Sequence, residues 1–221
     1  MATKTKTPGL PTANFRQRVG RERRERTRAR ILQSSFRVFA EKGHEQTAID
    51  DVIKAAEVAR GTFYNHFETI DDLLVATSKW LEDELILSIE SEIGKLKDPV
   101  ERLATGLRLW LRAASENEVF CAFIVRNRYR GELVEQQIAR DVGKAIRKGQ
   151  FAVRNADAGR DLIIGSAREA LTRMMAGPAG KGYVDEVARA ILRGLGVDAR
   201  SIERLVTLEL PAIRGLPAPA S

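Results

Sequence analysis

The sequence of 221 residues is poor in the residues that form disulfides and metal sites. Its single cysteine, Cys121, has no intrachain partner for a disulfide, which fits a protein of the reducing cytoplasm. Two histidines, His44 and His66, add too few ligands for a zinc site, so we expect no metal centre. A phosphate-binding glycine loop, a nucleophile elbow and a paired-histidine motif are also missing, so the sequence predicts neither a cofactor nor an enzyme.

Long apolar runs are missing as well. No stretch approaches the roughly 18 residues that a helix needs to cross a bilayer, and residues 1–15 contain no apolar segment of a secretory signal. We therefore expect a cytoplasmic protein without a membrane partner. The composition, 43% hydrophobic and 30% charged, is sufficient for a globular core.

Charge is distributed unevenly. Residues 1–30 hold ten Lys/Arg and two Glu, whereas residues 31–70 hold four basic and six acidic residues. The net charge of +7 therefore comes from the N-terminal segment. Such arms commonly bind nucleic acid, although a solvated tail has the same composition. Because residues 1–21 lack apolar periodicity, we predict a disordered basic arm there.

The remainder of the chain has the periodicity of helices and no alternating strand pattern. We predict an all-α fold of about nine helices, with a three-helix domain at 22–70, a larger helical bundle at 71–210 and a loose tail at 211–221. The expected helices cover about 22–42, 47–56, 60–67, 69–93, 99–114, 118–126, 132–150, 161–176 and 183–195, with a shorter one at 198–208.

Residues 47–67 have the pattern of two short helices joined by a tight turn. Thr47, followed by Asp50, predicts a capping box at the first helix, and Thr69 with Asp72 predicts another at the long helix beyond. Phe63 and Phe67, four residues apart, should point inward. The remaining small, polar and aromatic residues of the second helix suit a surface that reads DNA, so we interpret the segment as a helix-turn-helix.

The motif has a fixed order: a helix, Gly43, a helix that starts at a threonine, a turn, the helix Arg-Gly-Thr-Phe-Tyr-Asn-His-Phe, and a capped helix with an acidic first turn. This order resembles the DNA-binding domain of TetR-family regulators. The resemblance covers about residues 24–75, and the rest resembles the family only as a helical region of suitable length. It implies a homodimeric repressor that binds a palindromic operator and is released by a small hydrophobic or amphipathic ligand. The alternative is a DNA-binding regulator or architectural protein without such an effector, controlled by a protein partner.

The resemblance also implies which residues contact double-stranded DNA: Thr47, Ala48, Arg60, Gly61, Thr62, Tyr64, Asn65 and His66. Thr47 would bind phosphate through its hydroxyl and backbone N–H, Arg60 would bind a guanine edge or a phosphate, and Asn65 would read a base. Structural roles compete, since Thr47 could act only as a cap and Arg60 could pair with Glu57.

Two positions depart from the family pattern. Glu57 replaces a glycine that is frequent in the turn, and Ile70 replaces a phosphate-binding lysine. The basic arm could compensate for the missing lysine.

The C-terminal region gives weaker signals. By resemblance, helices between about 71 and 150 enclose a ligand pocket, with Trp110, Phe120, Cys121 and Phe123 as candidate lining residues, although ordinary core packing explains the same pattern. Arg126, Arg128 and Arg130 flank Tyr129 in a polar stretch that could hold an anion or form a solvated loop. The helices at 161–176 and 183–195 would form the dimer interface, or else intrachain core.

Overall fold

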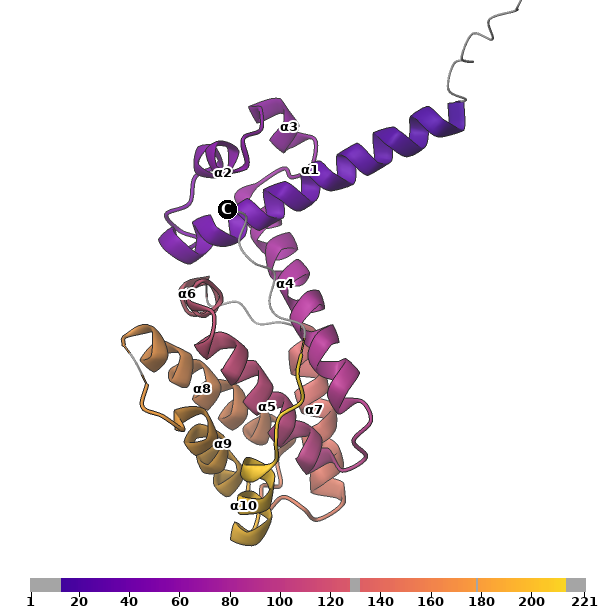
Figure 1. Cartoon of the computed structure of the whole chain (residues 1–221). Coiled ribbons are helices and arrows are strands. Elements are labelled where there is room, and N and C mark those ends of the chain that lie inside the picture. Colours follow the sequence, from indigo (N-terminus) through magenta and orange to yellow (C-terminus); the bar gives the residue numbers. More distant parts are fainter. Residues whose placement is uncertain (1–12, 128–131, 178, 214–221) are drawn as a thin grey trace, which may run out of the picture.

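We describe the chain from a computed structural model that covers residues 13–127, 132–177 and 179–213. Within these residues the chain forms ten α-helices and no strand, which confirms the all-α prediction (Figure 1). The helices are α1 (Ala13–Lys42), α2 (Ile49–Ala56), α3 (Arg60–Tyr64), α4 (Ile70–Ile93), α5 (Pro99–Ser115), α6 (Glu118–Asn127), α7 (Glu132–Arg147), α8 (Ala156–Met175), α9 (Tyr183–Gly194) and α10 (Ala199–Thr207). The segments 1–12, 128–131 and 214–221, with Arg128, Tyr129, Arg130 and most of the expected tail, lie outside the described residues.

Helices α1 to α3 form a small head, and the first half of α1 projects from it (Figure 1). The head is held by buried apolar side chains, among them Phe36, Phe39 and Val52. Phe63 and Phe67 are buried with them and their ring centroids are 6.0 Å apart, so the prediction that both point inward is confirmed.

The start of α1 differs from the prediction. Its helix begins at Ala13, whereas the sequence predicted a disordered arm to residue 21 and a helix from residue 22. Arginine and glutamate are good helix formers, and here they are spaced for ion pairs between successive turns. Arg18 and Arg21 lie 3.7 Å from the carboxylates of Glu22 and Glu25, respectively. The missing apolar stripe misled the prediction, because this part of α1 packs against no core.

Other helix boundaries also differ, among them the end of α7 at Arg147 rather than near residue 150. Helix α8 begins at Ala156 rather than near residue 161, because the Asn155 side chain accepts a hydrogen bond from the N–H of Ala158 at 2.9 Å. Helix α3 ends at Tyr64 rather than near residue 67.

Helix α4 joins the head to the body of the molecule. Its predicted capping box is confirmed: the Thr69 hydroxyl accepts from the N–H of Asp72 at 3.0 Å, and Asp72 accepts from the N–H of Thr69 at 3.1 Å. Two turns further along, the hydroxyls of Thr77 and Ser35 are hydrogen bonded at 2.7 Å, which fastens α4 to α1. A movement of α4 is therefore passed directly to the head.

Helix α6 forms a second connection between body and head. The ring of Phe123 meets Phe36 edge-on at 5.4 Å and Phe39 at 6.4 Å, both on α1. The amide of Asn127 donates to the carbonyl of Phe39 at 3.2 Å. The sequence indicated only the α4 connection, since a contact between helices so far apart in the chain leaves no local pattern.

The body packs α5 against α4, α7, α8, α9 and α10 (Figure 1). Buried Arg102 on α5 lies 2.8 Å from Glu90 on α4 and 3.2 Å from Asp141 on α7, which joins three helices. None of the helices in the described segments is long and apolar enough to cross a membrane.

Candidate nucleic-acid interface and ligand cavity

The first helix of the motif is capped at a different residue from the one predicted. The N-cap of α2 is Ala48, whose N–H is bonded to the Asp51 carboxylate at 3.0 Å. Thr47 is buried: its hydroxyl donates to the carbonyl of Gly43 at 2.7 Å, and its N–H donates to the carbonyl of His44 at 3.1 Å. The predicted cap is therefore wrong. Because acids stand at both 50 and 51, a capping box could start at residue 47 or at residue 48, and the turn after Gly43 places the N-cap at residue 48. Both groups of Thr47 that were expected to bind phosphate are engaged inside the protein.

The turn between α2 and α3 keeps the geometry that glycine usually supplies. Glu57 has φ 49° and ψ 49°, a left-handed conformation. Its neighbour Val58 donates from its N–H to the carbonyl of Ile53 at 3.2 Å, closing the end of α2. The departure at residue 57 therefore leaves the path of the backbone unchanged and adds strain to one residue.

Helix α3 and the two residues that follow it carry most of the predicted DNA-contacting residues. Arg60, Gly61, Tyr64 and Asn65 are exposed, while Thr62 and His66 are half-buried. Arg60 pairs with Asp50 of α2 rather than with Glu57, and both side chains of the pair are exposed. DNA binding must compete with this pair, which costs little at an exposed site.

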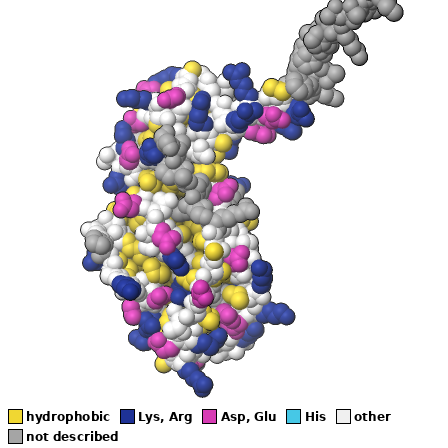
Figure 2. Space-filling view, in the orientation of Figure 1, with side chains coloured by type: hydrophobic (Ala, Val, Ile, Leu, Met, Phe, Trp, Pro, Cys, Tyr) yellow, Lys and Arg dark blue, Asp and Glu magenta, His cyan; other side chains and the backbone are white. Residues whose placement is uncertain are grey.

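An open groove lies between α1 and the turn with α3. From α1 it is lined by Gly20, Arg23, Arg24, Thr27 and Arg30, and from the other side by Glu57, Val58, Ala59, Thr62, Asn65 and His66. The guanidinium of Arg24 donates to the carbonyl of Asn65 at 3.3 Å. Figure 2 shows arginine side chains, together with glutamates, along the projecting part of α1. The groove thus places arginines beside the predicted base-reading residues.

The individual arginines of this groove were not among the predicted site residues. Residues 23, 27 and 30 recur at helical spacing and so share one face of α1, which is the signal that could have identified them. The prediction treated these arginines only as part of the positive charge of residues 1–30. At the other departure, Ile70 begins α4 and packs partly buried against the core, so this position supplies no cation.

His66 is one of the residues that line the groove between α1 and α3. Partial burial lowers its pKa from the ordinary value, and the guanidinium groups of Arg24 and Arg28 lower the pKa further. The imidazole is therefore neutral at pH 7. Positive charge in the groove comes from arginine, which stays protonated at every relevant pH.

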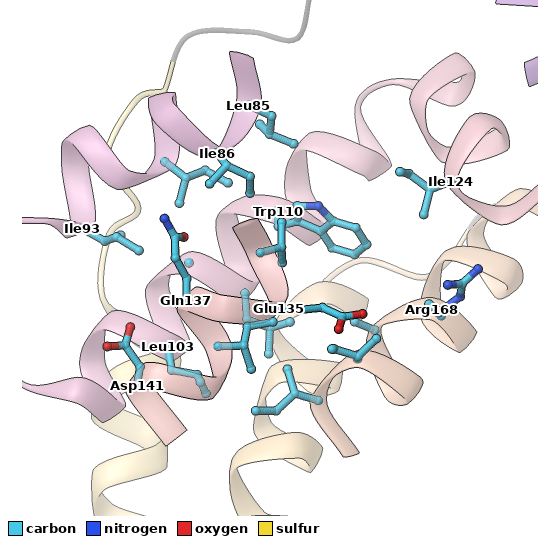
Figure 3. A pocket seen from close by; sticks show the side chains of 18 of the residues that line it. Leu85, Ile86, Ile93, Leu103, Trp110, Ile124, Glu135, Gln137, Asp141 and Arg168 are labelled. Atoms are coloured by element: carbon cyan, nitrogen blue, oxygen red, sulfur yellow. The ribbon is translucent and has the colours of Figure 1, made fainter. Parts of the chain in front are cut away.

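The body contains a cavity of about 160 Å³ between α4, α5, α6, α7 and α8 (Figure 3). Trp110, Phe120 and Phe123, which the sequence analysis named as candidate ligand contacts, lie in its wall, and their contact with a ligand stays a prediction. Cys121 does not line the cavity: its thiol donates to the carbonyl of Leu171 on α8 at 3.4 Å, and burial raises the pKa of the thiol. Neighbouring residues of one helix point in different directions, so Cys121 could not share a face with both phenylalanines.

The cavity wall is mostly aliphatic and aromatic, with a few polar side chains (Figure 3). Arg102 and Asp141 neutralise each other at one end. Besides Oδ1 of Asp141, two buried oxygens in the wall have no hydrogen-bond partner among the described residues, namely Oγ of Ser78 and Oε1 of Glu135. The sequence missed both, because Glu135 stands in a polar stretch that resembles a solvated helix face.

In the two helices predicted to form a dimer interface, some apolar side chains face the core of the protomer and others face solvent. Ile163 and Leu171 of α8 and Ile191 of α9 are buried within the chain, which is the intrachain alternative. Leu162 and Met175 are exposed large apolar residues on the outside of α8. Helix α9 also has exposed positions, among them Ala190, so the prediction that both helices meet a partner stays a prediction.

Residues 31–77 match the family model described as bacterial regulatory proteins of the tetR family. The chain carries a TetR-family DNA-binding domain. Over 82 residues it is 34% identical to the transcriptional regulator CymR of Pseudomonas putida, a match that covers 37% of this chain and 40% of CymR. The chain therefore spans less than half the length of this curated relative, and the similarity is concentrated in the TetR-family domain.

Solved structures extend the likeness to the body. The structure of RolR without ligand has a TM-score of 0.68 and 25% identity, covering 85% of this chain and all of RolR. RolR in complex with resorcinol has a TM-score of 0.64 and 24% identity, covering 88% of this chain. The fold of a TetR-family domain joined to a helical body is thus shared along most of the chain.

Proposed function

We propose that the protein is a homodimeric transcriptional repressor that binds a palindromic operator and is released by a small molecule. The observation that carries this proposal is the connection between the two sites. A TetR-family head, matched over residues 31–77, is joined to a cavity through α4 and α6. Head and cavity in one chain are what a ligand-controlled regulator requires.

DNA would be read by α3 in the major groove. Arg60 and Asn65 are the candidate base contacts, and Gly61, Thr62, Tyr64 and His66 lie beside them toward the phosphates. Arg23, Arg24 and Arg30 of the groove would hold the adjacent backbone in place of the missing cation at residue 70. Thr47 and Ala48 flank this surface, and a contact from Thr47 requires its hydroxyl to exchange the Gly43 carbonyl for a phosphate oxygen.

Release would follow from two contacts that share residues with the cavity wall. Phe123 lines the cavity and meets Phe36 of α1, while Ser78 lines the cavity beside Thr77, which is bonded to Ser35 of α1. A ligand that fits only when α4 or α6 has moved shifts the population away from the DNA-binding arrangement. The cavity also favours this function over the partner-controlled alternative, for which a collapsed core would be expected.

The experiment combines selection of bound duplexes from a random pool with fluorescence anisotropy on the selected site. We expect a palindrome bound by a dimer. Asn65→Ala should weaken binding by roughly 1–3 kcal/mol and relax the preference at one base position. Gln136→Ala, at an exposed position on α7, is the matched control and should change neither. A pool that yields no enriched sequence would reject the sequence-specific repressor.

A further inference from the structure

The polar atoms of the cavity between α4 and α8 specify what it can hold. The Ser78 side chain is 2% exposed, and its Oγ has no hydrogen-bond partner among the described residues. Oε1 of Glu135 is buried in the same wall and is also without one. A buried carboxylate oxygen without a hydrogen bond raises the free energy of the protein. A ligand that donates a hydrogen bond to it should therefore bind more tightly than the same ligand without a donor.

The size of the cavity limits the occupant. A volume of about 160 Å³ is close to the roughly 150 Å³ of an engineered apolar cavity that binds benzene. One six-membered ring with a small substituent therefore fits. A long acyl chain or a nucleotide-bearing thioester does not fit in this arrangement of the helices.

Charge limits the occupant further. Two cations also line the wall: Arg102 pairs with Glu90 and Asp141, and Arg168 has an interaction of its own. An anion would place a second negative charge beside Glu135, which raises the free energy of both groups. A cation would have to leave water to form a buried ion pair, and such pairs recover little beyond the desolvation penalty. A neutral hydroxyl donates one hydrogen bond without charge repulsion and without the desolvation penalty of an ion. The apolar wall then packs against the ring.

We propose that the cavity binds a neutral one-ring compound bearing a hydroxyl, which donates to Glu135, with Ser78 receiving a second polar group or the ring edge. This rests on the proposed function insofar as the cavity is the effector site. Glu135 on α7 selects the ligand. Ser78 on α4 senses it, because the neighbouring Thr77 is bonded to Ser35 of the head.

The test measures binding to the full-length protein without DNA, by calorimetry, with three probes: phenol, toluene and benzoate. Phenol and toluene have similar size and differ in the donor, so phenol should bind at least about tenfold more tightly. Benzoate should bind most weakly. Equal affinities for phenol and toluene, tightest binding of benzoate, or no binding of any probe would each overturn the assignment.

Two variants locate the preference. Glu135→Leu replaces an unsatisfied carboxylate by an apolar side chain in an apolar wall, so it should fold, and its binding of toluene reports that it has. Its ratio of phenol to toluene affinity should fall to about one. Glu84→Leu, at an exposed position on α4, is the control and should keep the wild-type ratio. A preference for phenol that survives Glu135→Leu would show that another group selects the ligand.

Failure of this inference is distinguishable from failure of the proposed function. Release from the selected operator is measured separately by anisotropy. If phenol binds as expected and the operator stays bound, the ligand assignment stands and repression by ligand release is rejected for that compound. If no probe binds while sequence-specific DNA binding is observed, the ligand assignment is rejected and the regulator remains.

Discussion

At the scale of single residues, the turn of the TetR-family domain holds Glu57 in a left-handed conformation with φ 49°. Among the non-glycine residues that the structure describes, Glu57 alone has a positive φ. The cost for an L-residue is about 1–2 kcal/mol, offset in part because glutamate loses less backbone entropy on folding than glycine would. Glu57 also lines the basic groove, where its carboxylate opposes an approaching phosphate.

Glu57→Gly should therefore raise the free energy of unfolding by about 0.5–1 kcal/mol, because the strain relieved exceeds the added entropy of the unfolded chain. It should also tighten DNA binding, since one negative charge leaves the groove. Urea denaturation measures the first effect and anisotropy the second. Glu68→Gly, at an exposed position on the same head, serves as control and should not stabilise. A destabilised Glu57→Gly would contradict the assignment of strain to this residue.

His66 gives the protein a pH dependence on the acid side. Burial first, and then Arg24 and Arg28, lower its pKa below the ordinary value of 6.5. Between the lowered pKa and 6.5 the unfolded chain binds more protons at this residue than the folded chain does. The free energy of unfolding therefore falls as the pH drops through and below 6.5.

His66→Asn should remove this part of the acid sensitivity. Urea denaturation at pH values of about 7.5 and 5.5 should show a smaller loss of stability in the variant than in the wild type. An equal loss in both proteins would indicate that His66 does not titrate differently on folding.

At the scale of elements, α1 combines two functions in one helix. Its second half supplies Phe36 and Phe39 to the core of the head, and its first half carries the arginines of the groove. Because the helix is continuous from Ala13, these arginines are held at fixed positions relative to α3. Ordered cations lose less entropy on binding phosphate than cations of a flexible tail would.

Replacing Arg23, Arg24 and Arg30 together by glutamine should weaken DNA binding about equally on specific and random duplexes. The slope of log affinity against log salt should become shallower by about 0.9 for every phosphate that the variant no longer neutralises. The measurement is anisotropy between about 50 and 200 mM salt. The control replaces three body-surface cations, Lys95, Lys97 and Arg200, by glutamine. If both triple variants change the slope equally, only net charge matters and the groove makes no contacts of its own.

The elements that the sequence could predict are those whose signal is local. Thr69 with Asp72, and Pro99 after Asp98, mark helix starts within four residues, and the structure has both. The start of α1 could not be predicted from an apolar stripe, because no core faces it. At α2, adjacent acids made two capping registers equally plausible.

The candidate sites divide in the same way. Aromatic residues at helical spacing identified Trp110 and Phe123 in the cavity wall, since apolar lining leaves a periodic pattern. Glu135 and Ser78 left no such pattern in the sequence. They stand out because their buried oxygens have no hydrogen-bond partner, which only the folded structure shows. The sequence showed the positive charge of the groove arginines, but it did not show that they lie on one surface with the residues around α3.

At the scale of the whole molecule, a TetR-family head needs a second copy to read a palindrome. The outer surface of α8 belongs to the predicted interface and is open to solvent, and Gly165 lies on it exposed. A Cβ atom added at Gly165 would meet nothing within 4 Å in the protomer. A large side chain there is therefore compatible with the fold and incompatible with close approach of a partner helix.

Gly165→Arg should convert the dimer to a monomer and lower operator affinity, with little change in the stability of the protomer. Light scattering after size exclusion gives the mass, and anisotropy gives the affinity. Gln136→Arg on α7 carries the same added charge away from this surface and should remain dimeric. A Gly165→Arg protein that is still a dimer would place the interface elsewhere.

The continuity of α1 has a mechanical consequence. Phe123 contacts its inner half at Phe36 from the cavity side, while Arg23 of the groove lies further out on the same helix, about 20 Å from Phe36 at 1.5 Å per residue. A tilt of about 5° at the inner end would displace the outer end by about 2 Å, since displacement grows with the length of the arm. Such a shift is enough to break a charge-assisted hydrogen bond of 2.7–2.9 Å. In the proposed mechanism the helix would therefore act as a lever, which turns a small rearrangement around the ligand into the loss of several phosphate contacts at once.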